Sequence, residues 1–270
     1  MQLEMLITPL IEISQQAGQA IMQVYQREDF GIQAKQDDSP VTEADLAAHR
    51  TICNALQALT PEIPLLSEEE AGISFEQRRR WSRYWLIDPL DGTKEFIRRN
   101  DEFTVNIALI ENNQPIFGIV YLPVTGVAYY GGQGIGAWKQ YLNETAQPIR
   151  CRPLSEAITV LISRRHKNDR DQPILHKIEQ HFSTVTTESY GSSLKMCRIA
   201  EGSADFYPRL YPTCEWDTAA AQAVVEAAGG MMLNTDLTPL RYNQQESLIN
   251  PFFYVLGDPD FPVSLLVEKP

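Results

Sequence analysis

Residues 85–96 read WLIDPLDGTKEF, an apolar, strand-like segment that ends in two aspartates separated by a proline and a leucine. Burying one carboxylate is costly, and burying two side by side costs more unless a cation lies between them. Pro89 fixes its own φ and keeps Asp88 extended, so Asp88 and Asp91 can converge with the Leu90 carbonyl between them. Carboxylate and carbonyl oxygens are hard ligands that suit Mg²⁺. The segment therefore predicts a metal site at the end of a buried strand.

Gly92 and Thr93 extend this segment toward a ligand site. Gly92 lets the backbone approach a bound group closely, and Thr93 begins a short helix predicted to run through Phe96. Free amide groups at such a helix start attract anions. The simpler interpretation is a turn in which Asp91 caps the helix. That interpretation leaves Asp88, at the end of an apolar strand, unexplained.

The composition is that of an ordinary folded protein. Of the 270 residues, 43% are hydrophobic and 21% are charged, and the formal net charge is −12. Such a charge repels nucleic acid polymers, so an anionic ligand must be held by local groups or by metal. The four cysteines are scattered, without the spacing of a zinc site or a disulfide framework. With neither a signal peptide nor a membrane-spanning apolar run, we expect a cytoplasmic monomer or homodimer, peripheral membrane association being left open.

Helical periodicity characterises the start of the chain. Apolar residues recur at helical spacing over residues 3–25, and a second helix opens near Thr42 and runs to about Leu59. From Tyr84 onward the period changes to short β-rich runs separated by Asn, Gly and Pro, which predict hairpins of a mostly antiparallel sheet. These runs cover residues 84–88, 103–110, 114–123, 126–130 and 134–140.

Strands and helices alternate beyond Arg150. The pattern predicts strands at 158–163 and 204–207 and helices at 174–181, 193–200 and 216–228. Because no linker, repeat or low-complexity segment interrupts the chain, we expect a single catalytic domain over residues 1–270. Its amino-terminal lobe would cover about 1–150 and its carboxy-terminal lobe about 151–270.

Three further acidic residues become candidates only together with the two aspartates of 88–91. Glu68 belongs to the run Ser67-Glu68-Glu69-Glu70, which on its own is better interpreted as a solvated charge run. Asp217 lies in the first turn of an alanine-rich helix, where a negative charge is favourable without any ligand. Asp45 matches a capping box with Thr42.

Residues 132–137, GQGIGA, fit the GxGxxA fingerprint of a dinucleotide-dependent oxidoreductase. The fingerprint requires the start of a helix, whereas β-like sequence flanks this segment. A hairpin turn is therefore the better interpretation of its glycines.

The blocks LLSEEE (65–70), DPLDGT (88–93) and EWDTAA (215–220) resemble the signatures of the lithium-sensitive, magnesium-dependent phosphatases of the inositol monophosphatase superfamily. Together with KQDDSPVTEAD (35–45) and GSSLKMCRIAEGSADFYPR (191–209), they are similar to its CysQ-type 3′(2′),5′-bisphosphate nucleotidases. The resemblance covers nearly the whole chain. It implies an α+β fold, a layered α-β-α-β-α sandwich of two lobes with the site between them.

The resemblance also implies metal ligands. Glu68, Asp88 and the Leu90 carbonyl would hold one Mg²⁺, and Asp88, Asp91 and Asp217 would hold a second. A third, weaker ion would lie near Glu68. Two such ions, at roughly 3.5 to 4 Å from each other, would clamp a phosphoryl group.

Catalytic roles follow from the same likeness. Thr93, hydrogen-bonded to Asp45, would orient the attacking water, and Glu68 is the third catalytic candidate. The amides of Gly92 and Thr93 would hold the transferred phosphate. Leu90, Asp91 and Asp217 would contact the substrate beside them.

Four residues are implied as contacts to the nucleotide: His166, Ser192, Lys195 and Arg209. Taken alone, Lys195 and Arg209 would be interpreted as surface charges, because most basic side chains are exposed. His166 is explained equally well as an exposed loop histidine. Arg165 stands before it where relatives commonly carry a serine.

These inferences predict a Mg²⁺-dependent phosphatase that hydrolyses adenosine 3′,5′-bisphosphate (PAP) to AMP and phosphate. The phosphosulfate PAPS, hydrolysed to APS, is a second candidate substrate. One alternative keeps the chemistry and changes the substrate to inositol monophosphate or another small sugar phosphate. A non-catalytic nucleotide-binding regulator and the oxidoreductase are alternatives from other classes.

Overall fold

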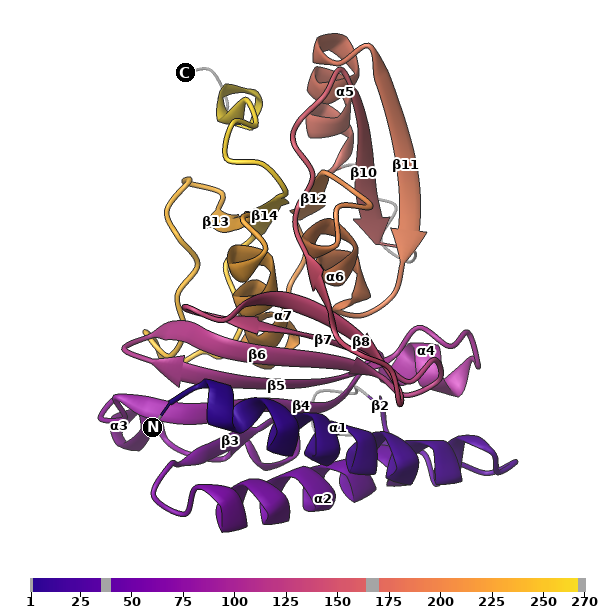
Figure 1. The fold of residues 1–270 in the computed structure, drawn as a ribbon, viewed down its shortest axis with the longest axis vertical. Helices are drawn as coiled ribbons and strands as arrows, with labels where there is room; N and C mark the ends of the chain where they lie inside the picture. Colours follow the sequence, from indigo (N-terminus) through magenta and orange to yellow (C-terminus); the bar gives the residue numbers. More distant parts are fainter. Residues whose placement is uncertain (1, 35–39, 164–169, 267–270) are drawn as a thin grey trace.

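The computed structural model describes residues 2–34, 40–163 and 170–266. Helices and sheets alternate in five layers: a helix pair, a large sheet, a second helix pair, a smaller sheet and an outer helix (Figure 1). The α+β class and the α-β-α-β-α order that the sequence predicts are thereby confirmed.

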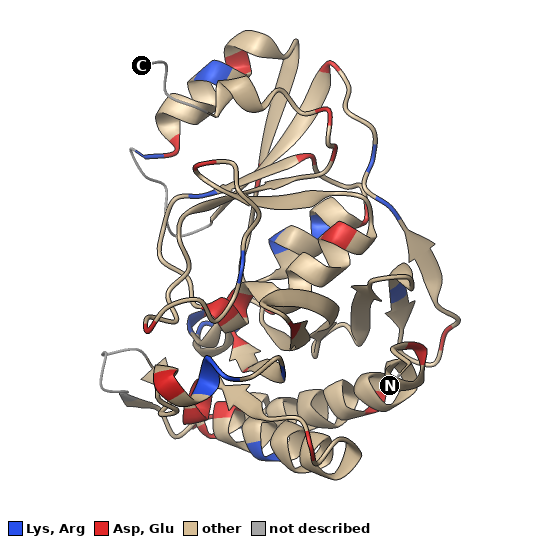
Figure 2. Cartoon of the chain, turned by 90° about the vertical axis from the view of Figure 1, so that its left-hand side faces the viewer, with Lys and Arg blue, Asp and Glu red and all other residues tan. Residues whose placement is uncertain are grey.

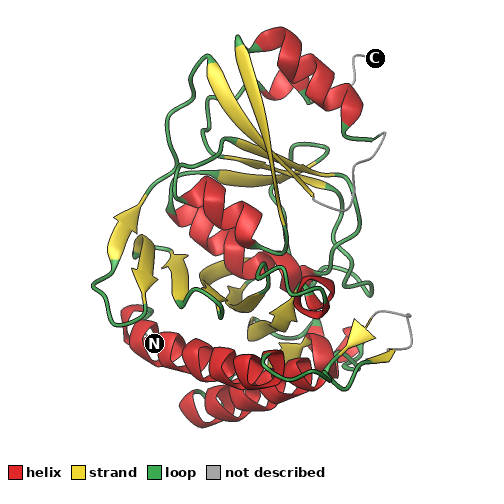
Figure 3. Ribbon diagram, turned by 90° about the vertical axis from the view of Figure 1, so that its right-hand side faces the viewer, coloured by secondary structure: helices red, strands yellow, loops and turns green. Residues whose placement is uncertain are grey.

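The first layer consists of α1 (Glu4–Tyr25) and α2 (Glu43–Leu59), which lie side by side at the base of the molecule (Figure 3). Both helices were predicted at nearly these bounds. The apolar stripe of α1 is buried, with Leu10 and Ile21 fully inaccessible to solvent. At the start of α2, Thr42 and Asp45 form the predicted capping box.

The large sheet has the strand order β3-β4-β5-β6-β7-β8-β9. Neighbouring strands are antiparallel, except that β3 runs parallel to β4. The mostly antiparallel sheet predicted from the sequence is therefore confirmed. The strands are β3 (Leu65–Ser67), β4 (Arg83–Asp91), β5 (Thr104–Glu111), β6 (Gln114–Leu122), β7 (Val127–Gly132), β8 (Gly136–Tyr141) and β9 (Gln147–Ile149).

Both faces of this sheet are covered. Trp85 and Ile107 face the core shared with α1 and α2, whereas Leu86 and Ala108 face the core on the other side. Successive side chains of a strand point to opposite faces, so a sheet buried on both faces needs nearly continuous apolar strands.

The middle layer consists of α6 (Leu194–Ala200) and α7 (Glu215–Ala227). The alanine-rich helix α7 crosses β5, β6 and β7 at close range. A Cβ at Gly118 of β6 would lie 2.2 Å from the carbonyl oxygen of Ala220. A glycine therefore allows this approach, which places the start of α7 over the end of β4.

The smaller sheet has the order β11-β10-β12-β14-β13, and α5 (Gln172–His181) covers its outer face. Its strands are β10 (Ala157–Ser163), β11 (Thr184–Tyr190), β12 (Phe206–Arg209), β13 (Met231–Asn234) and β14 (Phe253–Leu256). The remaining elements are short: β1 (Gln33–Ala34), β2 (Pro40–Val41), η1 (Glu68–Glu70), α3 (Phe75–Arg78), α4 (Thr93–Ile97) and η2 (Val263–Leu265).

The GQGIGA segment is a hairpin. β7 ends at Gly132 and β8 begins at Gly136, so the turn between them joins two antiparallel strands. Gly134 and Gly136 both have φ of +77°, a conformation that glycine adopts without strain. The prediction of a turn is confirmed, and the dinucleotide fingerprint lacks the helix it requires.

Charged residues are spread over both halves of the molecule. In the view of Figure 2, the described Lys and Arg residues are interspersed with Asp and Glu and do not gather in one basic stripe. Among the described residues, no helix is both long enough and apolar enough to cross a membrane.

Candidate active site

The aspartates of β4 owe their common direction to a bulge. Asp88 pairs with Asn106 of β5, and Asp91 pairs with Thr104, so three steps along β4 match two steps along β5. In a regular strand, side chains three residues apart point to opposite faces. The extra residue restores the alternation and turns both carboxylates to the face covered by α6 and α7.

Leu90 anchors this bulge. Its side chain is 1% exposed and belongs to the core beneath the sheet, on the side of α1 and α2. Its N–H donates to Asp88 Oδ1 at 3.0 Å, while Pro89 has no N–H to place. Residues 88–91 are thus fixed on both sides of the sheet. The Leu90 side chain is buried on the side of α1 and α2, and Asp88 and Asp91 point to the side of α6 and α7.

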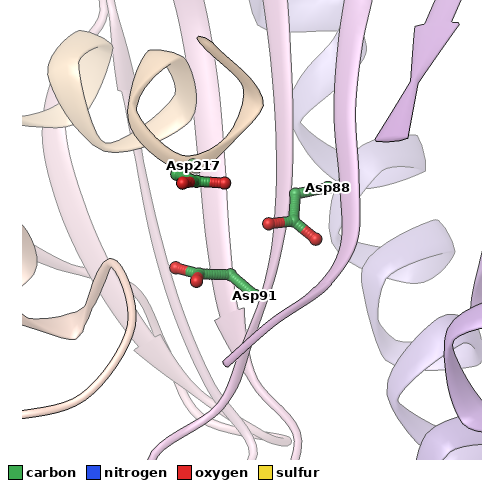
Figure 4. Close-up of side chains that lie close together, drawn as sticks. All are labelled: Asp88, Asp91 and Asp217. Atoms are coloured by element: carbon green, nitrogen blue, oxygen red, sulfur yellow. The ribbon is translucent and has the colours of Figure 1, made fainter. Parts of the chain in front are cut away.

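Asp217 joins the two aspartates from the opposite layer. It lies in the first turn of α7, and its Oδ2 accepts the N–H of Cys214 at 2.9 Å. Carboxylate oxygens of Asp88, Asp91 and Asp217 all lie within 4.8 Å of one another (Figure 4). Asp217 therefore lies in the first turn of a helix, as predicted, and also belongs to the acidic cluster.

The three carboxyl groups resist simultaneous ionisation. Burial raises the pKa of Asp88 well above its ordinary value, and the charges of Glu68, Asp91 and Asp217 raise it further. Burial, together with Asp91 and Glu68, does the same to the pKa of Asp217. Burial raises the pKa of Asp91 to about 6, although Lys195 acts to lower it. An all-oxygen cluster of this charge suits a hard divalent cation, which would neutralise it.

Glu68 begins η1, next to the end of β3. Its side chain lines the same cavity as the three aspartates, and its charge acts on Asp88. Glu70, at the other end of η1, has a side chain that is 80% exposed. The interpretation as a solvated run therefore fits Glu70, whereas Glu68 faces the cavity.

Thr93 and Asp45 connect α4 to α2. Thr93 Oγ1 lies 3.1 Å from Asp45 Oδ1 and 3.4 Å from the Leu90 carbonyl oxygen. Asp45 Oδ2 accepts both the N–H and the hydroxyl of Thr42, so the capping box occupies one carboxylate oxygen and Thr93 the other. Burial raises the pKa of Asp45 to about 6. Before Thr93, Gly92 has φ of +91°, which favours glycine.

A cavity of about 510 Å³ lies beside these groups, and residues of both sheets line it. Lys195 is only 4% exposed, so the interpretation of this residue as a surface charge is wrong. Its ammonium donates to the carbonyl oxygens of Tyr190 at 3.0 Å and Ser192 at 2.8 Å, which satisfies a buried cation locally.

Arg209 lines the same cavity at the end of β12, and its Nη1 donates to Ser163 Oγ at 2.7 Å. Ser192 also lines it, with φ of +45°. His166 and the preceding Arg165 lie outside the described residues. The structure thus brings together every other predicted site residue around one cavity or its immediate support.

Ser193 and Tyr207 are among the residues of the cavity wall that were not predicted. Ser193, 1% exposed, donates its N–H to Asp91, and Tyr207 places its ring 5.4 Å from Lys195 Nζ. Neither carries a sequence signal of its own, because a serine before a helix and a tyrosine within a strand both have simple structural explanations.

A five-layer fold that places three clustered carboxylates beside a cavity lined also by Lys195 and Arg209 suits a metal-dependent phosphatase. The sequence model of the inositol monophosphatase family matches residues 2–256. The chain belongs to this family, whose enzymes depend on metal, generally Mg²⁺.

Among curated relatives, the 3′(2′),5′-bisphosphate nucleotidase CysQ of Salmonella typhimurium is 47% identical over 251 residues, covering 93% of this chain and 99% of the relative. CysQ of Haemophilus influenzae is 38% identical, covering 96% and 95%. Among solved structures, CysQ of Bacteroides thetaiotaomicron matches with a TM-score of 0.80 at 36% identity, covering 94% and 97%. An inositol monophosphatase of Thermotoga maritima matches in fold, with a TM-score of 0.74 at 23% identity over 95% and 94%.

Proposed function

We propose that this chain hydrolyses adenosine 3′,5′-bisphosphate to AMP and phosphate in a Mg²⁺-dependent reaction. The observation that carries the proposal is a cavity lined both by three clustered carboxylates and by the buried cation of Lys195. A substrate with two phosphate groups matches both the metal ligands and the cation. The CysQ relatives named above bear the name of this activity, and PAPS is a second candidate substrate.

The carboxylates would hold two ions. Glu68, Asp88 and the Leu90 carbonyl form one set of oxygen ligands, and Asp88, Asp91 and Asp217 form the other, with a third, weaker ion near Glu68. Bound Mg²⁺ supplies a Lewis acid for the phosphoryl oxygens and lowers the pKa of a coordinated water. The raised pKa values of the three clustered aspartates support this assignment, because a cation would remove their mutual repulsion.

The chain's own residues would orient the water. Thr93 Oγ1 donates a hydrogen bond to Asp45, which leaves the lone pairs of the hydroxyl oxygen to accept a hydrogen bond from water. Ionised Asp45 keeps Thr93 in this orientation, and Glu68 lies on the same cavity wall. The amides of Gly92 and Thr93 would hold the transferred phosphate beside Leu90, Asp91 and Asp217.

The part of the cavity lined by Lys195, Arg209 and Ser192 would hold the rest of the nucleotide. Lys195 donates two of its three N–H groups to carbonyl oxygens, which leaves the third for an anionic ligand. Arg209 and Ser192 line the cavity near it, and His166 is retained as a candidate contact. A second phosphate would therefore meet a pre-organised cation, at little cost in side-chain entropy.

The whole chain would act as one catalytic domain, because the cavity is lined by residues from both 1–150 and 151–270. Its action in the cytoplasm as a monomer or homodimer, and any peripheral membrane association, stay predictions. A sugar phosphate such as inositol monophosphate is the alternative substrate, since it needs the acidic cluster but has no use for Lys195. A non-catalytic regulator would have no evident use for clustered metal ligands.

The test is phosphate release from PAP and from inositol 1-phosphate, each measured with Mg²⁺ and with EDTA. We expect fast release from PAP with Mg²⁺, slow release from inositol 1-phosphate, and none with EDTA. Faster release from the inositol ester would show that PAP is not the preferred substrate, while metal-dependent phosphate hydrolysis would still be supported. Absence of release from both, by a protein that binds PAP, would favour the regulator.

A further inference from the structure

Ser193 connects the two lobes at the acidic cluster. It precedes α6 in the middle layer, and its N–H donates to Asp91 Oδ2 at 2.6 Å. Asp91 ends β4 of the large sheet, 102 residues earlier in the chain. One oxygen of this carboxylate is therefore fixed by a backbone donor from another layer.

The hydroxyl of Ser193 is held by the strand opposite the two aspartates. Ser193 Oγ lies 2.8 Å from Thr104 Oγ1 and donates to Asn106 Oδ1 at 2.8 Å. A serine hydroxyl has one proton, so Thr104 is the donor in the first of these bonds. Thr104 and Asn106 are the register partners of Asp91 and Asp88 on β5.

The backbone around Ser193 needs such support. The preceding residue, Ser192, has φ of +45°, a conformation that a residue with a side chain adopts at a cost. Without the hydrogen bonds of its hydroxyl to Thr104 and Asn106, Ser193 would be less firmly fixed in the position from which its N–H donates to Asp91. Groups that orient a metal ligand commonly change metal affinity by about 10- to 100-fold when they are lost.

We propose that Ser193 is a positioning residue for the divalent cation: Thr104 and Asn106 fix its hydroxyl, and its N–H then holds one oxygen of Asp91. The other oxygen of Asp91 remains for the cation. This inference rests on the proposed function, because it takes Asp91 as a metal ligand.

The test measures Mn²⁺ binding to the metal-stripped protein by electron paramagnetic resonance, without substrate. Ser193→Ala should weaken binding by about tenfold. Thr104→Val, which keeps the shape and removes the hydroxyl, should weaken it in the same direction. Thr104→Ser, which keeps the hydroxyl and removes a methyl group, should retain wild-type affinity.

A matched control removes a buried hydroxyl from the other face of β4. Thr60 accepts the indole N–H of Trp85 at 2.9 Å and is 3% exposed. Thr60→Val should lower the melting temperature and leave Mn²⁺ affinity unchanged. If Thr60→Val lost Mn²⁺ affinity to a similar extent, the weaker binding would be due to general destabilisation of the protein and not to the loss of positioning by Ser193.

Asp91→Asn separates this inference from the function on which it rests. If Asp91→Asn weakens Mn²⁺ binding while Ser193→Ala and Thr104→Val bind like wild type, positioning by Ser193 is wrong and the metal role of Asp91 stands. If Asp91→Asn keeps wild-type affinity, both are wrong. If Ser193→Ala does not fold, the Mn²⁺ affinities of Thr104→Val and Thr104→Ser are compared instead. Equal affinities of these two variants would overturn the inference.

Discussion

Replacing Asp91 by asparagine should make the metal-free protein more stable while removing the stabilisation that Mg²⁺ gives through the site of Asp88, Asp91 and Asp217. Burial raises the pKa of this carboxyl from its ordinary value of 3.8 to about 6. At about 1.4 kcal/mol for each tenfold change in proton affinity, its ionisation costs the folded state about 3 kcal/mol at neutral pH. Asparagine keeps a buried polar group, so we expect a net gain of about 1–2 kcal/mol.

The gain has a defined pH dependence. A raised pKa in the folded state means that the ionised carboxyl destabilises the fold above its unfolded pKa near 4, and that the cost grows until about pH 6. The advantage of Asp91→Asn should be full at pH 8 and shrink as the pH falls from 6 toward 4. For 270 residues, 1–2 kcal/mol corresponds to about 2–4 °C in melting temperature.

Thermal unfolding in EDTA and in Mg²⁺ tests both effects. At 100 times its Kd, Mg²⁺ in the site of Asp88, Asp91 and Asp217 should stabilise the wild type by about 2.7 kcal/mol, or about 5 °C, and Asp91→Asn should lack this contribution. The two proteins should therefore exchange their order of stability between the two buffers. Asp260→Asn, which removes an exposed negative charge, is the control and should behave as wild type. An Asp91→Asn variant that melts below wild type in EDTA at pH 8 would refute the reasoning.

Three further substitutions test other parts of the account. Thr93→Val removes the hydroxyl that contacts Asp45, so kcat should fall by about 10²–10⁴-fold with little change in Mn²⁺ affinity. An unchanged kcat would show that Thr93 has no role in the reaction. Arg209→Ala should raise the KM for PAP by about tenfold and the KM for inositol 1-phosphate by less than about twofold. Equal effects on the two KM values would show that Arg209 does not recognise the nucleotide. Gly118→Ala should lower stability by about 3 kcal/mol in urea unfolding, because its Cβ would meet Ala220, and wild-type stability would contradict this close approach.

The sequence predicted the elements that carry a clear period. The helices at 4–25 and 43–59 and the hairpins of the large sheet appear nearly where the pattern put them. The strand Thr184–Tyr190 was missed because TVTTESY lies at an edge of its sheet and shows no apolar alternation. The strands Met231–Asn234 and Phe253–Leu256 were missed because MMLN and FYVL are short, mostly apolar runs without alternation.

The site was less accessible to sequence reasoning than its acidic residues suggest. The cost of burial pointed to Asp88 and Asp91, but their common direction depends on a bulge defined by the register against β5, which spacing alone does not reveal. The burial of Lys195 depends on two carbonyl oxygens of a turn with a left-handed residue. Asp217 reaches the cluster from α7, which lies close to the sheet where Gly118 faces Ala220.

The most direct test of the metal site is anomalous diffraction from crystals of the protein soaked with Mn²⁺. The account predicts two peaks, each about 2.0–2.5 Å from carboxylate oxygens, with Asp88 contacting both, and Glu68 on one side and Asp217 on the other. Crystals of Asp217→Asn should lose the peak that Asp217 would share with Asp91. A map without a peak within reach of Asp88, Asp91 and Asp217 would contradict the account.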